Sequence, residues 1–120
     1  MSETEITKKC LLDLSKQDGV TVWRNNTGAL KNQSGQLVRF GLPGSGDILG
    51  LKATKITPEM VGKTFGLFIS IETKTKTGKQ RDQQERFEEM VIKHGGIYVV
   101  ARSPEQAVAG ISEVGNEQQD

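Results

Sequence analysis

The chemistry that this sequence offers rests on two carboxylates and one lysine. Asp47 follows a glycine-rich segment, and Glu72 and Lys74 stand near the end of an apolar run. Because side chains alternate across a β-strand, Glu72 and Lys74 are expected to point to the same face. If Asp47 lies on the adjacent strand, its carboxylate can approach that of Glu72. Two carboxylates, with the Thr73 carbonyl and water, suit octahedral Mg²⁺, and the ammonium of Lys74 could neutralise charge on an attacked phosphate.

A simpler interpretation is a solvated strand end. An acid and a lysine two residues apart are common there and form only a weak surface ion pair. Glu72 and Lys74 taken alone fit that interpretation. The ordered set around them is more specific, because an acidic helix, a Gly-x-Gly-Asp turn, an apolar strand with Glu-x-Lys and a glutamine-bearing helix follow one another. The whole order therefore favours a site over a surface pair.

The composition excludes several other kinds of chemistry. The 120 residues include one Cys and one His, so neither an internal disulfide nor a Cys/His zinc site is expected. Cys10 stands among apolar residues of a predicted helix and is expected to pack in the core. Charged residues make up 26% of the chain, and no apolar run approaches the roughly 18 residues of a membrane span. The polar N-terminal segment is also unlike a secretory signal.

The hydrophobic pattern predicts a single α/β domain over residues 1–114, followed by a frayed tail at 115–120. Amphipathic helices are expected at residues 3–16, 81–94 and 103–114, and strands at 20–25, 36–40, 47–51, 65–76 and 97–101. Glycines and polar residues predict a loop at 26–36, between hairpin strands, and a short helical turn at 57–59. The expected order is αββββαβα, one mixed sheet flanked by helices, with a right-handed parallel crossover in its last β-α-β unit.

This ordered set resembles the VRR-NUC domain of the PD-(D/E)XK nuclease superfamily. The likeness covers nearly the whole chain, and the stretches that carry it are residues 23–28 (WRNNTG), 41–47 (GLPGSGD), 71–74 (IETK), 84–87 (QERF) and 95–96 (GG). Gly46 stands where many members of the superfamily have proline before the aspartate. The resemblance implies a restriction-endonuclease-like fold.

The resemblance also implies an activity and the residues that carry it. Asp47 and Glu72 would bind Mg²⁺ or Mn²⁺ together with the Thr73 carbonyl, and Lys74 would assist hydrolysis of a DNA phosphodiester by a metal-activated water. Stand-alone domains of this kind suggest a homodimer that cuts branched DNA such as four-way junctions. Because small proteins of this type are often encoded by phages or prophages, the expected location is a bacterial cytoplasm.

The family places a glutamate of the first helix near the metal, and Glu3 and Glu5 are both candidates. Glu3 lies close to the centre of the apolar stripe formed by Ile6, Cys10 and Leu14, whereas Glu5 falls on the solvent side. We therefore expect Glu3 near the site and Glu5 as a capping residue. First-turn acids that only complement the helix dipole are the alternative.

A glutamine of the second helix is expected to aim its amide at the same centre. Gln80, Gln83 and Gln84 all lie toward the apolar side of that helix, and Gln84 fits the family spacing of glutamine and phenylalanine. Gln84 is therefore the predicted site glutamine, where it could position water or a phosphate. An ordinary surface position is the alternative.

The formal net charge of +1 conceals an uneven distribution. Residues 20–81 hold ten Lys and Arg against three Asp and Glu, whereas residues 82–120 hold three against eight. A basic middle segment is what binding to a phosphate backbone requires. The predicted DNA contacts are Arg24, Lys31, Arg39, Lys76, Lys79 and Arg81. The competing hypotheses are a non-catalytic nucleic-acid-binding or assembly module with a nuclease-like fold, and an α/β domain that binds an anionic metabolite at its glycine-rich turn.

Overall fold

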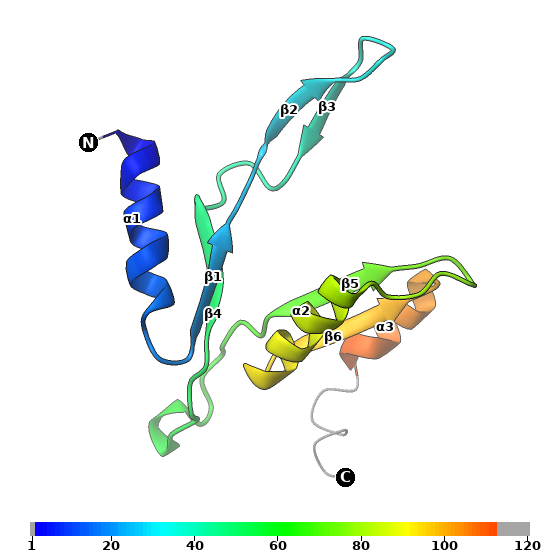
Figure 1. The fold of residues 1–120 in the computed structure, drawn as a ribbon. Helices are drawn as coiled ribbons and strands as arrows, with labels where there is room; N and C mark the ends of the chain where they lie inside the picture. Colours follow the sequence, from blue (N-terminus) through cyan, green and yellow to red (C-terminus); the bar gives the residue numbers. More distant parts are fainter. Residues whose placement is uncertain (1, 113–120) are drawn as a thin grey trace. The chain divides into compact units, whose positions relative to one another are not determined.

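A computed structural model describes residues 2–112 and shows a mixed α/β protein (Figure 1). Two compact units make up the chain, Met1–Lys52 and Ala53–Asp120, and each is described below by itself. The predicted tail at 115–120 lies outside the described residues. Within residues 2–112, no helix combines the length and the apolarity that crossing a bilayer requires.

The first unit begins with a helix packed on a two-stranded antiparallel sheet. Helix α1 (Glu3–Ser15) starts as the sequence predicts, because Ser2 Oγ accepts a hydrogen bond from the Glu5 amide at 3.2 Å. Strand β1 (Val20–Arg24) pairs with β4 (Ile48–Lys52), and α1 packs on β1. Asp47 therefore immediately precedes β4.

The apolar stripe of α1 is not the side that this helix buries, so the prediction that Cys10 packs in a core is wrong. Cys10 is exposed, and its neighbours Ile6 and Leu14 are 44% and 38% exposed. Leu11 and Thr7 are the half-buried residues of the helix. The helix therefore rests on β1 through a face rotated away from the stripe.

A β-hairpin occupies part of the segment predicted as a loop. Strand β2 (Gly28–Lys31) pairs with β3 (Leu37–Phe40), and Asn32 closes the turn by accepting hydrogen bonds from the amides of Ser34 and Gln36, both at 2.9 Å. Gly, Ala and Lys are depleted in strands, so the sequence of β2 gives little β signal. Pairing with β3 and the Asn32 turn determine this strand instead.

The hairpin has an apolar face and a basic face. Every residue of both strands is exposed. The register places Leu30 opposite Val38 on one face, next to the Phe40 ring, which lies over Gly28. Lys31 and Arg39 fall on the other face, because side chains alternate along each strand. The hairpin therefore presents two cations of the predicted DNA-binding set to one side.

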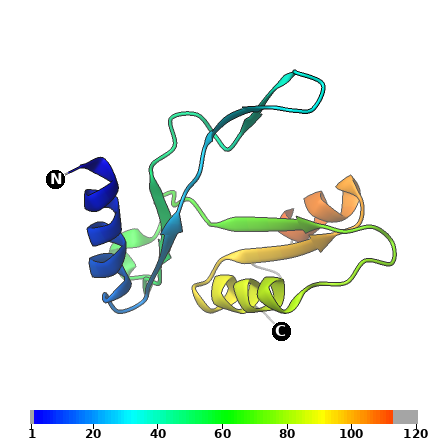
Figure 2. The ribbon, with the colours of Figure 1, turned by 45° about the horizontal axis from the view of Figure 1, so that its top comes forward.

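The second unit is a parallel strand pair between two helices. Its elements are η1 (Pro58–Met60), β5 (Ile69–Thr73), α2 (Asp82–Lys93), β6 (Ile97–Ala101) and α3 (Pro104–Ser112). The predicted parallel pairing of the last two strands is confirmed, with Glu72 opposite Val100. Helices α2 and α3 cover opposite faces of the pair (Figure 2). The rings of Phe87 in α2 and Tyr98 in β6 pack edge-to-face, with their centroids 6.3 Å apart.

Strand β5 is shorter than the segment predicted for it at residues 65–76. Phe65 and Leu67 are 60% and 47% exposed and precede the strand. A turn closed by the Gly78 amide and the Thr75 carbonyl at 3.2 Å follows it. The strand therefore ends directly after Glu72 and Thr73, which brings these residues to the loop that leads into α2.

Hydrogen bonds among residues 2–112 form three two-stranded sheets, β1–β4, β2–β3 and β5–β6. The α/β class is thus as predicted, with β2 as an additional strand. The single mixed sheet and the single domain stay predictions.

The contact between α3 and β6 yields a stability prediction at Gly110. A Cβ atom there would lie 2.5 Å and 2.7 Å from the two methyl carbons of Val99. Gly110→Ala gains about 1 kcal/mol of helix propensity but overpacks by about 1–3 kcal/mol. We expect a net loss of about 1 kcal/mol in the free energy of unfolding, measured by urea titration with circular dichroism. Gly66→Ala is the neutral control, because its added Cβ meets open space. An unchanged free energy of unfolding in Gly110→Ala would contradict the close packing of α3 on β6.

Candidate active site

Glu72 and Lys74 form an ion pair that is largely withdrawn from solvent. Glu72 lies in β5 and Lys74 directly follows that strand, and Lys74 Nζ lies 3.3 Å from Glu72 Oε2. The Glu72 and Lys74 side chains are only 9% and 16% exposed. The interpretation as a solvated surface pair is therefore wrong. Withdrawing two charges from water is unfavourable unless further polar groups compensate, so the neighbours of this pair matter.

Two side chains from outside β5 compensate the loss of hydration of the Glu72 carboxylate with hydrogen bonds. The Tyr98 hydroxyl of β6 donates a short hydrogen bond to Glu72 Oε1, and Gln80 Nε2 lies 3.4 Å from the same oxygen. Gln80 Nε2 also donates to Glu88 Oε1 of α2 at 2.9 Å. Strand β6 and the β5–α2 loop thus each provide a donor to the Glu72 carboxylate, and α2 anchors the loop donor Gln80.

The electrostatics keep Glu72 charged and Tyr98 protonated. Burial raises the pKa of Glu72, but hydrogen bonds from Tyr98 and Gln80 and the Lys74 ammonium outweigh burial and leave this pKa below its ordinary value. Burial and the Glu72 carboxylate raise the pKa of Tyr98 to about 12. At neutral pH Glu72 is therefore a carboxylate and Tyr98 a hydroxyl donor.

The Thr73 carbonyl lies on the edge of β5 that does not face β6. The Phe68 carbonyl accepts from the Ile97 amide, and the Lys74 amide donates to the Ala101 carbonyl, so even-numbered residues of β5 turn their backbone groups to β6. Backbone groups of neighbouring residues point to opposite edges. Thr73 is the exposed last residue of the strand, and its carbonyl oxygen is therefore available to a ligand.

The loop after β5 is held by an arginine that sequence reasoning missed. The Arg102 guanidinium donates to the carbonyls of Gly78 at 2.8 Å and Lys76 at 3.3 Å, and it also bonds the Thr75 carbonyl. No spacing in the sequence indicates this contact, because it joins residues more than twenty positions apart. The predicted DNA contacts Lys76, Lys79 and Arg81 are exposed and lie on this loop and its junction with α2.

The glutamine that meets Glu72 is Gln80, not the predicted Gln84. Gln84 Oε1 accepts a hydrogen bond from the Arg81 amide at 2.8 Å and so caps the start of α2. Gln83 is exposed on the first turn. Helical periodicity admits all three glutamines, and the family spacing selects Gln84. The loop conformation, which a helical projection does not include, brings Gln80 to the carboxylate.

In the first unit, Asn25 builds the turn that precedes Asp47. Asn25 Nδ2 donates to Ser45 Oγ at 2.7 Å and to the Gly46 carbonyl at 2.9 Å. The backbone amide of Asn25 donates to the Asp47 carbonyl at 2.9 Å, and Ser45 Oγ donates to the Leu42 carbonyl at 2.6 Å. The Asp47 side chain is exposed at the end of this turn. The glycine-rich segment is therefore a braced turn that presents Asp47.

The other predicted residues of the first unit are surface residues. Glu3 is in the first turn of α1, Arg24 ends β1, and Lys31 and Arg39 are on the hairpin; all four are exposed. Glu3 and Glu5 both begin the helix, and the Glu5 amide is the group that Ser2 caps. The choice of Glu3 over Glu5 as the site residue stays a prediction.

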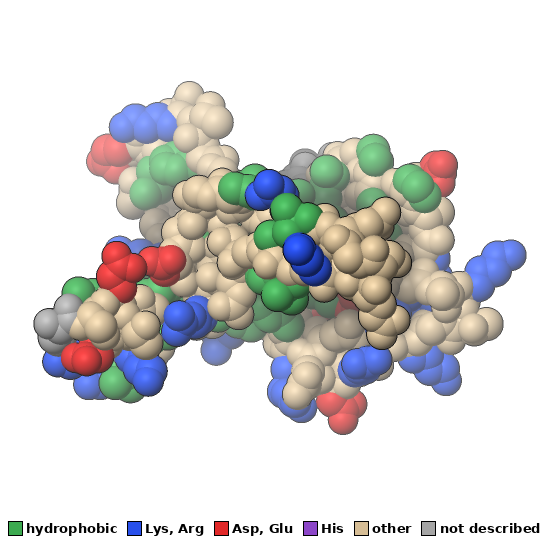
Figure 3. Space-filling model, turned by 90° about the horizontal axis from the view of Figure 1, so that it is seen from above, with side chains coloured by type: hydrophobic (Ala, Val, Ile, Leu, Met, Phe, Trp, Pro, Cys, Tyr) green, Lys and Arg blue, Asp and Glu red, His purple; other side chains and the backbone are tan. Residues whose placement is uncertain are grey.

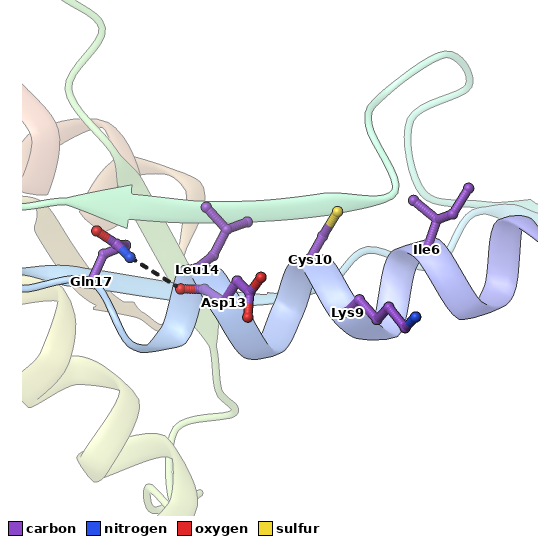
Figure 4. Close-up of a pocket in the computed structure, with 6 residues that line it drawn as sticks. All are labelled: Ile6, Lys9, Cys10, Asp13, Leu14 and Gln17. Atoms are coloured by element: carbon purple, nitrogen blue, oxygen red, sulfur yellow. Dashed lines mark hydrogen bonds between the residues drawn. The ribbon is translucent and has the colours of Figure 1, made fainter. Parts of the chain in front are cut away.

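A shallow hollow beside α1 is lined by residues of that helix and its end. Figure 4 shows Ile6, Cys10 and Leu14 on one side, with Lys9, Asp13 and Gln17 around them. Gln17 Nε2 lies 3.4 Å from the Asp13 carbonyl, and Asp13 pairs with Lys16 at 3.9 Å on the open surface. The hollow holds none of the predicted catalytic residues and gathers no polar cluster of its own.

The donors of the second unit suit part of a Mg²⁺ or Mn²⁺ site. Glu72 Oε2 is buried, and its neighbour is the Lys74 ammonium at 3.3 Å, so this oxygen of an ionised carboxylate has room for a second ligand. Mg²⁺ commonly uses one or two carboxylates and completes its shell with waters and substrate phosphate. Within residues 2–112, no three Asp, Glu, His or Cys side chains gather closely enough to enclose a metal ion.

Comparison of the chain with protein-family models, curated proteins and solved structures finds no match.

Proposed function

We propose that this protein is a Mg²⁺- or Mn²⁺-dependent DNA endonuclease of the VRR-NUC type. The observation that carries the proposal is the nearly buried Glu72–Lys74 pair, in which the Lys74 ammonium is the one neighbour of Glu72 Oε2 among the described residues. Buried ionisable groups with specific charge partners are typical of functional sites.

In this proposal each group of the cluster has a role in phosphodiester hydrolysis. Glu72 Oε2 and the Thr73 carbonyl would hold the metal, which would polarise the phosphate and activate the attacking water. Lys74, 3.3 Å from Glu72 Oε2, would stabilise negative charge that develops on the phosphate. Gln80 would keep Glu72 in place rather than touch the substrate.

Asp47 is proposed as the second carboxylate ligand on the strength of the family resemblance. The Asn25-braced turn supports this role, because it fixes the backbone next to an exposed carboxylate. The same resemblance leads us to propose the restriction-endonuclease-like mixed sheet and a site role for Glu3. Gln84 is not retained in the catalytic set, because it caps α2.

Exposed cations support a DNA substrate. Lys76, Lys79 and Arg81 follow the Glu72 cluster along the chain, and Lys31 and Arg39 share one face of the hairpin. Figure 3 shows Lys and Arg side chains at several places on the face that is seen from above. Lys and Arg side chains that neutralise phosphates supply the sequence-independent part of DNA binding. Arg24, at the end of β1, completes the proposed set.

The finer parts of the proposal are the DNA structure, the assembly and the location. Branched DNA such as a four-way junction, action as a homodimer and a bacterial cytoplasm all follow from the resemblance. A non-catalytic nucleic-acid-binding or assembly module is the competing function, and the exposed cations would serve it equally well.

One experiment separates the two functions. Linear, nicked, flap and four-way-junction DNA, each end-labelled, are incubated with the protein in Mg²⁺, Mn²⁺ or EDTA, and binding is measured in parallel at increasing salt. We expect metal-dependent cleavage of at least one substrate and binding that weakens as salt rises. Salt-sensitive binding without cleavage in either metal would reject the endonuclease and favour the binding module.

A further inference from the structure

The two oxygens of the Glu72 carboxylate have different surroundings. Oε1 accepts from the Tyr98 hydroxyl and lies 3.4 Å from Gln80 Nε2. Oε2 is buried, and its neighbour is the Lys74 ammonium at 3.3 Å; neither Tyr98 nor Gln80 bonds to it. The two oxygens of an ionised carboxylate are chemically equivalent, so exchanging them changes nothing. What the neighbours can determine is the plane of the carboxylate and which of its two oxygen positions stays open to a ligand.

Tyr98 is placed to hold this orientation. It lies on β6 opposite Ser70, on the same face of the strand pair as Glu72, and its ring meets the edge of Phe87 at 6.3 Å. Packing against α2 and hydrogen bonding to β5 thus fix both ends of the side chain. Its hydroxyl approaches Glu72 from the side of Oε1 only.

Gln80 supports the same oxygen from the loop. Its amide nitrogen is anchored by Glu88 Oε1 at 2.9 Å, the shorter of its two contacts, and reaches Glu72 Oε1 from there. The Glu88 carboxylate determines which end of the amide faces Glu72, because a carboxylate oxygen accepts and only the amide nitrogen donates. Gln80 therefore presents a donor, never an acceptor, to Glu72.

We propose that Tyr98 and Gln80 are positioning residues that engage Glu72 Oε1 and thereby present Oε2 alone to a divalent metal ion. This inference rests on the proposed function, and it adds the orientation of the ligand and the two residues that determine it. Partners that fix a ligand from outside the metal's own shell commonly change metal affinity by about 10–100-fold when removed. Neither residue needs to touch DNA or water for this role.

The test measures Mn²⁺ binding without DNA, by titration followed by electron paramagnetic resonance. Tyr98→Phe keeps the ring and its contact with Phe87 and removes only the hydroxyl, and we expect it to weaken Mn²⁺ binding about 10-fold. The Mn²⁺ concentration for half-maximal cleavage should rise by the same factor, while the rate at saturating Mn²⁺ changes less. Gln80→Ala is the second variant and should also weaken Mn²⁺ binding. Gln83→Ala, an exposed glutamine nearby, is the matched control and should not.

The outcomes separate this inference from the proposed function. Wild-type affinity for Mn²⁺ in both Tyr98→Phe and Gln80→Ala would overturn the positioning role even if the wild type cleaves DNA. Weakened Mn²⁺ binding in these variants of a protein that cleaves nothing would support the positioning role and reject the endonuclease. A wild type that binds no Mn²⁺ would overturn both.

Discussion

Replacing Lys74 by alanine is expected to lower the single-turnover rate of DNA cleavage by about 10²–10³-fold, the usual effect of removing one group that stabilises transition-state charge. Lys74 is the one cation within 4 Å of the Glu72 carboxylate among the described residues. DNA affinity should change little, because the other proposed contacts remain. The measurement is a quenched time course with protein in excess over an end-labelled substrate in saturating Mg²⁺.

Lys76→Ala is the matched control for this substitution. Lys76 lies two positions further along and is exposed, so its loss should weaken binding and reduce the salt dependence without lowering the rate of the bound complex. The Lys74 assignment would be rejected if Lys74→Ala cleaved as fast as the wild type. It would also be rejected if Lys76→Ala lost as much rate in the bound complex as Lys74→Ala.

The largest stability effect is expected at Gly50 of β4, which lies opposite Val22 of β1 in the antiparallel pair. A Cβ atom there would collide with the Thr21 carbonyl oxygen and lie 2.6 Å from Val22 Cγ1 and 2.9 Å from Val22 Cα. Because much of the obstacle is backbone, Gly50→Val cannot be relieved by a side-chain rotation. Overpacking of this kind costs about 3 kcal/mol or more, against about 1 kcal/mol gained in strand propensity. We expect a net loss of about 2 kcal/mol or more in the free energy of unfolding.

Trp23 offers a direct measurement of this loss, because it is the single tryptophan of the chain and pairs with Leu49 across β1 and β4. Its fluorescence during urea denaturation reports on the first unit. Gly46→Ala is the control, since its added Cβ would meet only the Ile48 carbonyl at an ordinary 3.5 Å. Equal midpoints for Gly50→Val and Gly46→Ala would contradict the close approach of the two strands.

The sequence predicts the elements that have strong local signals and misses those that depend on pairing. The helix starts depend on local groups, because Ser2 Oγ accepts from the Glu5 amide and Ser103 Oγ from the Gln106 amide, both at 3.2 Å. Strand β2 depends on β3 and on the Asn32 turn, neither of which is visible in its own four residues. The apolar residues at 65–68 resemble a strand, but most of them remain exposed and only the segment opposite β6 pairs.

The site residues also divide into those that local signals predict and those that depend on contacts distant in the sequence. Strand alternation correctly places Glu72 and Lys74 on one face, because that rule needs only neighbours along the chain. Tyr98 and Arg102 act from β6 and just beyond it, and no spacing relates them to residues of β5 and its loop. A buried polar donor among the apolar residues of a strand is the one signal that could have indicated Tyr98.

The most direct test that Glu72 holds a catalytic metal is DNA cleavage by Glu72→Gln. This isosteric change removes the charge and leaves the backbone and the Lys74 side chain in place. Wild type and variant, purified in parallel, are compared on a labelled four-way junction in Mg²⁺, in Mn²⁺ and in EDTA. We expect metal-dependent cleavage by the wild type, none in EDTA, and a rate for Glu72→Gln lower by about 10³-fold or more, the scale on which loss of a metal's Lewis-acid chemistry acts. Cleavage by Glu72→Gln at the wild-type rate would show that this carboxylate does not hold the catalytic metal.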